Sequence, residues 1–179
     1  MSGTRKKYDL NEKNYFKFFG ITEKQNISVR SLTANYKKII TILNSETDNF
    51  FKREKMAFST RSFETLADPI TRAKYLISLH GHESDVRDSA EPTDFIFVNQ
   101  LNHQFEMAST VEEVNDFILE LKNQTIWIKE QIEESIDTYK NYKVAAGLLN
   151  RFHEISTIHN KSKEKKTNIE AGITYVIFD

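Results

Sequence analysis

Apolar residues recur at intervals of three and four along nearly the whole chain, and very few residues interrupt them. The 179 residues include only five Gly and two Pro. Such spacing places apolar side chains on one face of a helix, and scarce Gly and Pro leave few points at which helices must end. The pattern therefore predicts an all-α protein with long helices and argues against a turn-rich β-sandwich.

The first half of the chain predicts four helices, each with a start or stop signal. Asn11 and Gly20 bound the first, Ser28 caps one that runs to Leu43, and another spans residues 50–66. Asp68-Pro69 opens the fourth, which ends at residues 80–81, because Asp is a good cap and Pro suits the first turn.

The second half predicts three longer helices. Thr93 is the expected cap of the first. Thr110-Val-Glu-Glu113 matches a capping box, in which the Thr and Glu side chains satisfy each other's backbone N–H groups. Asn141 opens the last helix, whose C-terminal part carries four Lys between residues 161 and 166. Short connections between these segments predict an antiparallel three-helix bundle.

Composition divides the chain into two modules. Residues 1–90 carry 16 Lys or Arg and 11 Asp or Glu, whereas residues 91–179 carry 9 and 15, so the net charge of −1 combines +5 and −6. Residues 82–92 are polar and lack an apolar stripe. We therefore expect five regions, which are a disordered leader (1–10), a helical module (11–81), a linker (82–92), a three-helix bundle (93–170) and a tail (171–179).

The sequence offers little chemistry for catalysis. The chain has no cysteine, which excludes disulfides, thiol nucleophiles and cysteine-ligated clusters. His80 and His82 are too few for a metal site, and phosphate-binding and hydrolase motifs are absent. No apolar run is long enough to span a membrane. We expect no catalytic residue, no cofactor and no membrane partner.

One sixteen-residue block carries a specific resemblance. Leu66-Ala-Asp-Pro-Ile-Thr-Arg-Ala-Lys-Tyr-Leu-Ile-Ser-Leu-His-Gly81 resembles the signature of the HscB-type J-domain co-chaperones, and Asn14-Tyr-Phe-Lys-Phe-Phe-Gly20 is similar to that family's opening motif. Helix order and length match over roughly residues 14–169. The resemblance implies a J-like module, followed by a three-helix bundle that binds the iron–sulfur scaffold protein IscU. It further implies that the protein presents IscU to a DnaK/HscA-type ATPase and is not itself an enzyme.

The main departure from the family lies in the loop after the second helix. J domains carry His-Pro-Asp there, which stimulates the chaperone ATPase, whereas this chain places Asn44, Ser45 and Glu46 at those positions. Lys37 and Lys38 keep the positive charge of the second helix. These five residues are the chaperone-binding candidates that the resemblance implies, with ATPase stimulation in doubt.

The resemblance also implies scaffold-binding residues in the bundle. Phe97, Val98 and Leu101 match apolar positions of the family's first bundle helix, whereas its acidic positions fall on Asn102, Phe105 and Ser109. The family's aromatic on the last helix falls on Glu154, and Phe152 replaces it if the register slips. Phe105 and Phe152 complete the candidate set, although Phe97, Val98 and Leu101 could equally be internal core.

Two other functions remain open. A J-like adaptor would bind a protein partner without stimulating an ATPase, and a small nucleic-acid-binding protein would use the basic first half, although +5 is a weak charge for that role. The family resemblance favours protein partners and no nucleic acid. It is compatible with a bacterial cytoplasm or a mitochondrial matrix.

Overall fold

The computed structural model of the chain describes residues 8–47, 50–88 and 92–173. These residues form helices and turns and no strand. In chain order the helices are α1 (Tyr15–Phe18), α2 (Val29–Asn44), α3 (Phe50–Ala67), α4 (Pro69–Leu79), α5 (Asp85–Asp88), α6 (Pro92–Met107), α7 (Val111–Asp137) and α8 (Tyr142–Glu170). The predicted all-α fold, a J-like helical module followed by a helical bundle, is confirmed.

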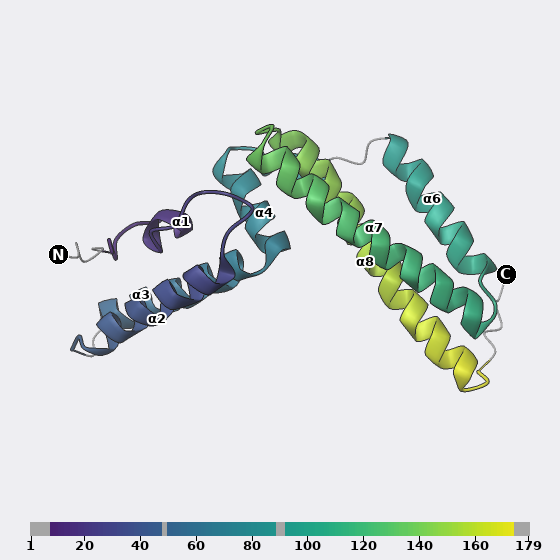
Figure 1. Cartoon of the computed structure of the whole chain (residues 1–179), viewed down its shortest axis with the longest axis horizontal. Helices are drawn as coiled ribbons and strands as arrows, with labels where there is room; N and C mark the ends of the chain where they lie inside the picture. The colour runs from purple at the N-terminus through teal and green to yellow at the C-terminus, as the bar shows by residue number, and fades with distance from the viewer. Residues whose placement is uncertain (1–7, 48–49, 89–91, 174–179) are drawn as a thin grey trace.

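The helices form two arms that meet at α4 (Figure 1). In one arm, α2 and α3 lie antiparallel and carry α1 beside them; in the other, α7 and α8 form a long antiparallel pair with α6 alongside. Helix α4 contacts α3 on one side and both α7 and α8 on the other. The two arms are therefore joined through α4 and not only through the chain between α4 and α6.

Most predicted helix ends are confirmed. Ser28 and Asn141 accept hydrogen bonds from the backbone N–H groups of Ser31 and Val144, and the Thr110–Glu113 capping box is complete. Asp68 accepts from two N–H groups of α4, which begins with Pro69 as expected. Each cap is a local arrangement of neighbouring residues, so sequence suffices to find it.

Two helix starts differ from the prediction. Asn14, not Asn11, caps α1 by accepting from the N–H groups of Phe16 and Lys17. Helix α6 begins at Pro92, so Thr93 lies inside it and is not its cap. Proline suits the first turn because it has no N–H to satisfy there.

The buried side chains form one hydrophobic cluster that runs through both arms. It includes Phe16, Phe18 and Leu32 of the J-like module and Leu121 and Ile155 of the bundle. The arms therefore share one core, although their sequences differ in charge.

The expected leader and linker take part in this packing. Residues 1–7, 89–91 and 174–179 lie outside the described residues. Tyr8, however, donates a hydrogen bond from its hydroxyl to Asn35, 3.1 Å away, and Leu10 packs against the core. Within the expected linker, α5 packs on α8 and Val86 contacts the core. Residues 8–10 and 82–88 are thus packed against other elements, because each offers a side chain to a neighbouring helix.

Candidate partner-binding surfaces

The block that carries the family resemblance lies at the joint between the two arms. The ring of Tyr75 stacks on Tyr15 with centroids 4.2 Å apart, and its hydroxyl oxygen accepts a hydrogen bond from the Tyr15 backbone N–H at 3.0 Å. Burial raises the pKa of the Tyr75 hydroxyl. Tyr75 therefore fixes α1 onto α4, which is a structural role.

Arg72 organises the same joint from inside. Its side chain is 6% exposed, and it donates from Nε to the carbonyl of Gln25 at 2.8 Å and from Nη1 to the carbonyl of Leu66. Burial lowers the pKa of Arg72, while the carboxylates of Asp68, Glu133 and Asp137 oppose that shift. The guanidinium thus satisfies backbone carbonyls that would otherwise be buried without partners.

The loop between α1 and α2 is held against the end of α7. The carboxylate of Asp137 accepts from the backbone N–H of Gln25 at 2.7 Å and from that of Asn26 at 2.8 Å. The Asn26 side chain donates to Glu133 at 2.7 Å. Since this loop belongs to the J-like module and Asp137 to the bundle, these bonds hold the two modules together.

The predicted chaperone-binding residues all lie exposed on the J-like module. Lys37, Lys38 and Asn44 belong to α2, while Ser45 caps its C-terminal end. The carbonyls of Asn44 and Glu46 accept hydrogen bonds from Lys52 Nζ at 3.5 and 2.9 Å. Residues 44–46, which the resemblance predicts to replace His-Pro-Asp, thus form an exposed helix end whose carbonyls bind Lys52.

Sequence reasoning missed the apolar residues beside this loop. Phe50 and Phe51 are 72% and 69% exposed, and Ile42 is 42% exposed on α2. Ile42 follows Lys38 by four residues, which places both on one face of the helix. The signal available in the sequence was the position of this Phe-Phe pair, directly after a polar run and at the start of a predicted helix.

The structure divides the predicted scaffold-binding residues of α6. Phe97 and Val98 are half-buried, so part of each side chain is accessible, whereas Leu101 is only 2% exposed. Leu101 lies in the core cluster, so its side chain offers a partner very little contact area. This position is better explained as internal core, the alternative that the sequence left open.

Phe105 is held by Lys165 of α8. The Lys165 Nζ lies 4.7 Å from the centre of the Phe105 ring and donates to the carbonyls of Phe105 and Glu106 at 2.6 and 3.2 Å. Burial lowers the pKa of Lys165. The lysine thus satisfies carbonyl groups at the C-terminal end of α6, where cations are favourable.

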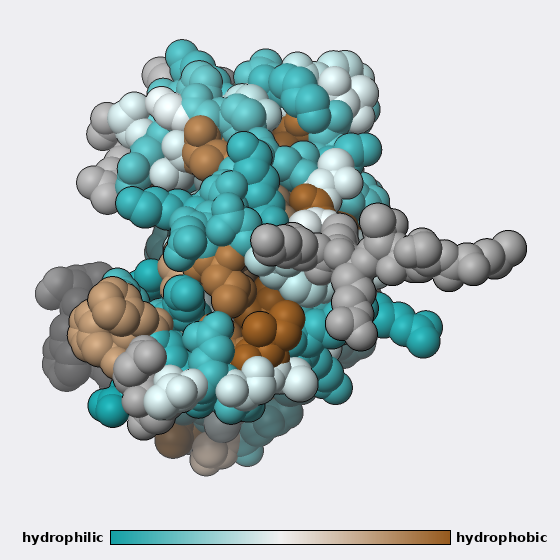
Figure 2. Space-filling view, turned by 90° about the vertical axis from the view of Figure 1, so that its left-hand side faces the viewer, coloured by the Kyte–Doolittle hydropathy of each residue, from teal (hydrophilic) through white to brown (hydrophobic). Residues whose placement is uncertain are grey.

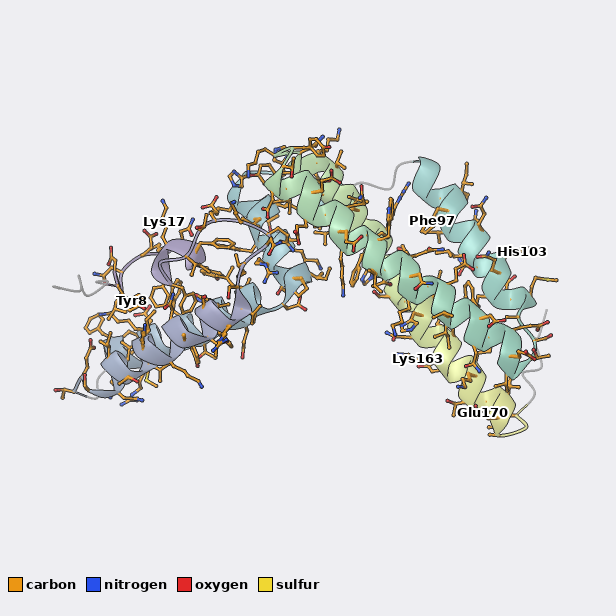
Figure 3. All side chains as sticks on the ribbon, viewed as in Figure 1. Tyr8, Lys17, Phe97, His103, Lys163 and Glu170 are labelled. Carbon is orange, nitrogen blue, oxygen red and sulfur yellow. The ribbon has the colours of Figure 1, made fainter. Side chains whose placement is uncertain are left out.

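A groove of about 280 Å³ separates part of α6 from α7. Figure 3 labels Phe97 and His103 on α6, at two levels along this groove. The guanidinium of Arg151 on α8 lies 5.5 Å from the centre of the Phe97 ring. The residues that line the groove are Phe97, Gln100, Leu101, His103, Gln104, Glu120 and Gln124.

Phe152 does not join this surface. Its ring lies 5.4 Å from Lys129 Nζ of α7, whereas the preceding residue, Arg151, reaches Phe97 of α6. Successive helical residues point about 100° apart, so the two side chains leave α8 in different directions. Phe97 and Phe152 therefore contact different neighbours.

The two histidines at the end of α4 have structural contacts. His80 and His82 both stack on Tyr142, with ring centroids 4.1 and 5.8 Å away, and contact Glu23 and Asp85. Within the described ranges, no three His, Asp or Glu side chains gather closely enough to hold a metal ion. No described helix has the length and apolar composition needed to cross a membrane.

Curated proteins similar to this chain carry the name of the family that the sequence block resembles. No family model matches the chain. A co-chaperone protein HscB homolog from Aeromonas hydrophila is 25% identical over 146 residues, which cover 74% of this chain and 84% of that protein. Another from Shewanella woodyi is 28% identical over 110 residues, 58% of this chain and 61% of that protein. The chain resembles the HscB co-chaperones.

Solved structures extend this HscB resemblance to the fold. Chaperone HscB from Vibrio cholerae has a TM-score of 0.70 at 17% identity, over 87% of this chain and 99% of that chain. Human co-chaperone protein HscB has a TM-score of 0.73 at 17% identity, over 87% and 83%. The chain is thus a divergent HscB-like protein whose J-like module and bundle are arranged as in HscB structures.

Proposed function

We propose that this chain is a co-chaperone of iron–sulfur cluster assembly that brings an IscU-type scaffold protein to a DnaK/HscA-type ATPase. The observation that carries the proposal is the combination of a J-like module and a helical bundle in one HscB-like fold. Two relatives named co-chaperone protein HscB homolog, at 25% and 28% sequence identity, support it.

The two proposed surfaces lie on different arms. The chaperone would contact the exposed end of the J-like module, at Lys37, Lys38 and the 44–46 loop. The scaffold would contact the accessible parts of Phe97 and Val98 on α6, with Leu101 supporting them from the core. Because hydrogen bonds hold the arms together at Asp137, the protein would keep both partners in a defined relative position.

A steady-state ATPase assay tests this function directly. The full chain is titrated into the chaperone with and without the IscU-type scaffold. We expect ATPase stimulation that increases when Asn44→His, Ser45→Pro and Glu46→Asp restore the J-domain motif together. Absence of stimulation by the unmodified chain at saturation would rule out the co-chaperone mechanism.

Scaffold binding is tested separately. We expect Phe97→Ala with Val98→Ala to weaken capture of the scaffold in a pull-down, because both truncations reduce the apolar contact area on α6. Leu119→Ala is the matched control, since Leu119 is a 56% exposed apolar residue on α7. Equal loss in the control, or capture unaffected by the α6 variant, would contradict the proposed surface.

A protein-interaction adaptor is the second candidate. Two observations favour it: the loop after α2 contains no His-Pro-Asp, and Lys52 binds the backbone there. An adaptor would capture the scaffold normally yet leave the ATPase rate unchanged. The two assays together therefore distinguish the adaptor from the co-chaperone.

A further inference from the structure

The end of the J-like module presents an unusual pair of exposed aromatic side chains. Phe50 and Phe51 are the first two residues of α3, and both are about 70% exposed. Their rings lie 5.9 Å apart at 76°, an edge-to-face arrangement. Both residues belong to a helical turn, so the pair is presented from a fixed backbone, and an exposed aromatic pair of this kind is typical of an interface anchor.

A hollow lies beside the pair. Phe51 lines a groove of about 330 Å³ between α3 and residues 10–13, together with Glu54, Lys55 and Phe58 of the same helix. Figure 2 looks onto this end of the molecule and shows hydrophobic side chains at the surface among mostly hydrophilic ones. A partner would therefore meet a projecting aromatic pair next to a partly apolar hollow.

Charge restricts what the partner can be. Residues 36–61 contain six Lys or Arg and three Asp or Glu. Lys37, Lys38 and Arg53 are exposed on the two helices that end at this surface. A symmetric contact with the same surface of a second copy would bring like charges together, which disfavours that mode of self-association. Residues 1–7, although close in sequence to the groove, are polar and basic apart from Met1 and offer little apolar surface to fill it.

We propose that Phe50 and Phe51 are the apolar anchor by which the J-like module binds its chaperone, at a partner surface with an apolar pocket bordered by carboxylates. This inference rests on the proposed function and adds residues to its chaperone-binding surface. An anionic membrane would meet the same excess of basic residues, so adsorption to anionic vesicles is included as an outcome of the test. In place of the missing His-Pro-Asp, the end of the module would use aromatic burial to hold the chaperone.

Binding of the full chain to a purified DnaK/HscA-type chaperone with ATP tests the anchor. We expect Phe50→Ser with Phe51→Ser to raise the Kd about tenfold or more, since aromatic anchors carry most of an interface's affinity. The matched control is Phe95→Ser with Ile96→Ser, an adjacent pair on α6 that is 70% and 59% exposed. We expect this control to bind the chaperone normally and both variants to keep the wild-type helical circular dichroism.

The outcomes separate the anchor from the proposed function. Binding of the Phe50/Phe51 variant with wild-type affinity would overturn the anchor while leaving the co-chaperone function intact. A wild-type chain that fails to bind the chaperone would overturn both. Adsorption of the wild type, but not the variant, to phosphatidylglycerol vesicles without chaperone binding would assign the pair to a lipid surface and overturn the inferred partner. As a second measurement, p-benzoylphenylalanine at position 51 should photocrosslink to the chaperone, and the same label at position 95 should not.

Discussion

The two ends of the J-like module differ in how far their polar and aromatic side chains are buried. At the joint with the bundle, Arg72 is buried and both tyrosines of the Tyr15–Tyr75 stack are partly buried. At the opposite end, Phe50 and Phe51 project into solvent and the 44–46 loop is exposed. One end is therefore built to hold the molecule together, while the other is free to meet a partner.

This difference separates resemblance from function. The residues that identify the chain as HscB-like, from Leu66 to Gly81, lie mostly at the joint, where packing restricts which side chains fit. Residues 44–46, which are predicted to replace the J-domain motif, lie exposed at the free end, where no core restricts them. The resemblance is thus strong at residues that maintain the fold and weak at residues that would contact the partner.

The strongest test of the joint is Arg72→Ala. Loss of the guanidinium leaves the carbonyls of Gln25 and Leu66 without their donor in a buried site, so we expect the free energy of unfolding to fall by about 3 kcal/mol. Urea denaturation followed by circular dichroism measures it. Lys74→Ala, an exposed position on the same helix, is the control and should change stability by less than about 0.5 kcal/mol. A similar loss of stability in both variants would mean that Arg72 does not stabilise the joint more than an exposed residue does.

The sequence predicted this fold well because most of its signals are local. Ser28, Asp68, Asn141 and the Thr110–Glu113 box cap helices through neighbouring N–H groups, which depend on little else. The docking of residues 82–88 was not predictable, because it depends on Tyr142, sixty residues away in sequence, receiving the ring of His82.

The candidate site was harder to predict because burial of its residues also depends on helices distant in the sequence. Phe97, Val98 and Leu101 are all apolar residues of one helix, and only the positions of α7 and α8 decide that Leu101 is buried while the other two stay partly accessible. Exposure of Phe50 and Phe51 likewise depends on how α3 packs, because Phe51 precedes Phe58 by seven residues and so has the spacing of a buried helix face.

Asp137→Asn tests the contact between the modules with a smaller change. The amide retains one acceptor oxygen for two backbone N–H groups, so we expect a loss of about 1 kcal/mol. Hydrogen exchange at the Gln25 and Asn26 amides should accelerate more than exchange within α8. The control is Asp116→Asn on the same helix, at an exposed position. Unchanged exchange at both amides would mean that Asp137 does not hold the loop.

Lys165→Met extends the comparison to the far end of the bundle. The substitution keeps an unbranched side chain over Phe105 but removes the donor to the carbonyls of Phe105 and Glu106. We expect the free energy of local opening to fall by about 1 kcal/mol. This loss should appear as faster hydrogen exchange over residues 105–108 and not elsewhere. Lys161→Met, an exposed position on α8, should leave exchange unchanged. If the free energy of unfolding of the whole chain fell as much as in Arg72→Ala, the outer end of the bundle would contribute as much to global stability as the joint.

The smallest expected effect concerns the first turn of α7. The carboxylate of Glu113 accepts hydrogen bonds from the backbone N–H groups of Ser109 and Thr110, which lower the pKa of this exposed group in the folded state. Because the folded pKa lies below the unfolded one, the stabilisation is present above the ordinary Glu pKa and is lost as the pH falls through the lowered value.

An NMR titration of the Glu113 carboxyl should therefore place its midpoint below that of Glu113 in the urea-unfolded chain. The stability difference between wild type and Glu113→Gln should shrink as the pH falls, whereas Glu112→Gln, which alters an exposed neighbour outside the capping box, should not reproduce that trend. Identical midpoints in the folded and unfolded chains would mean that the capping box is not formed in solution. In that case α6 and α7 would be joined by a looser turn, and the outer end of the bundle would resemble the free end of the J-like module more than the joint.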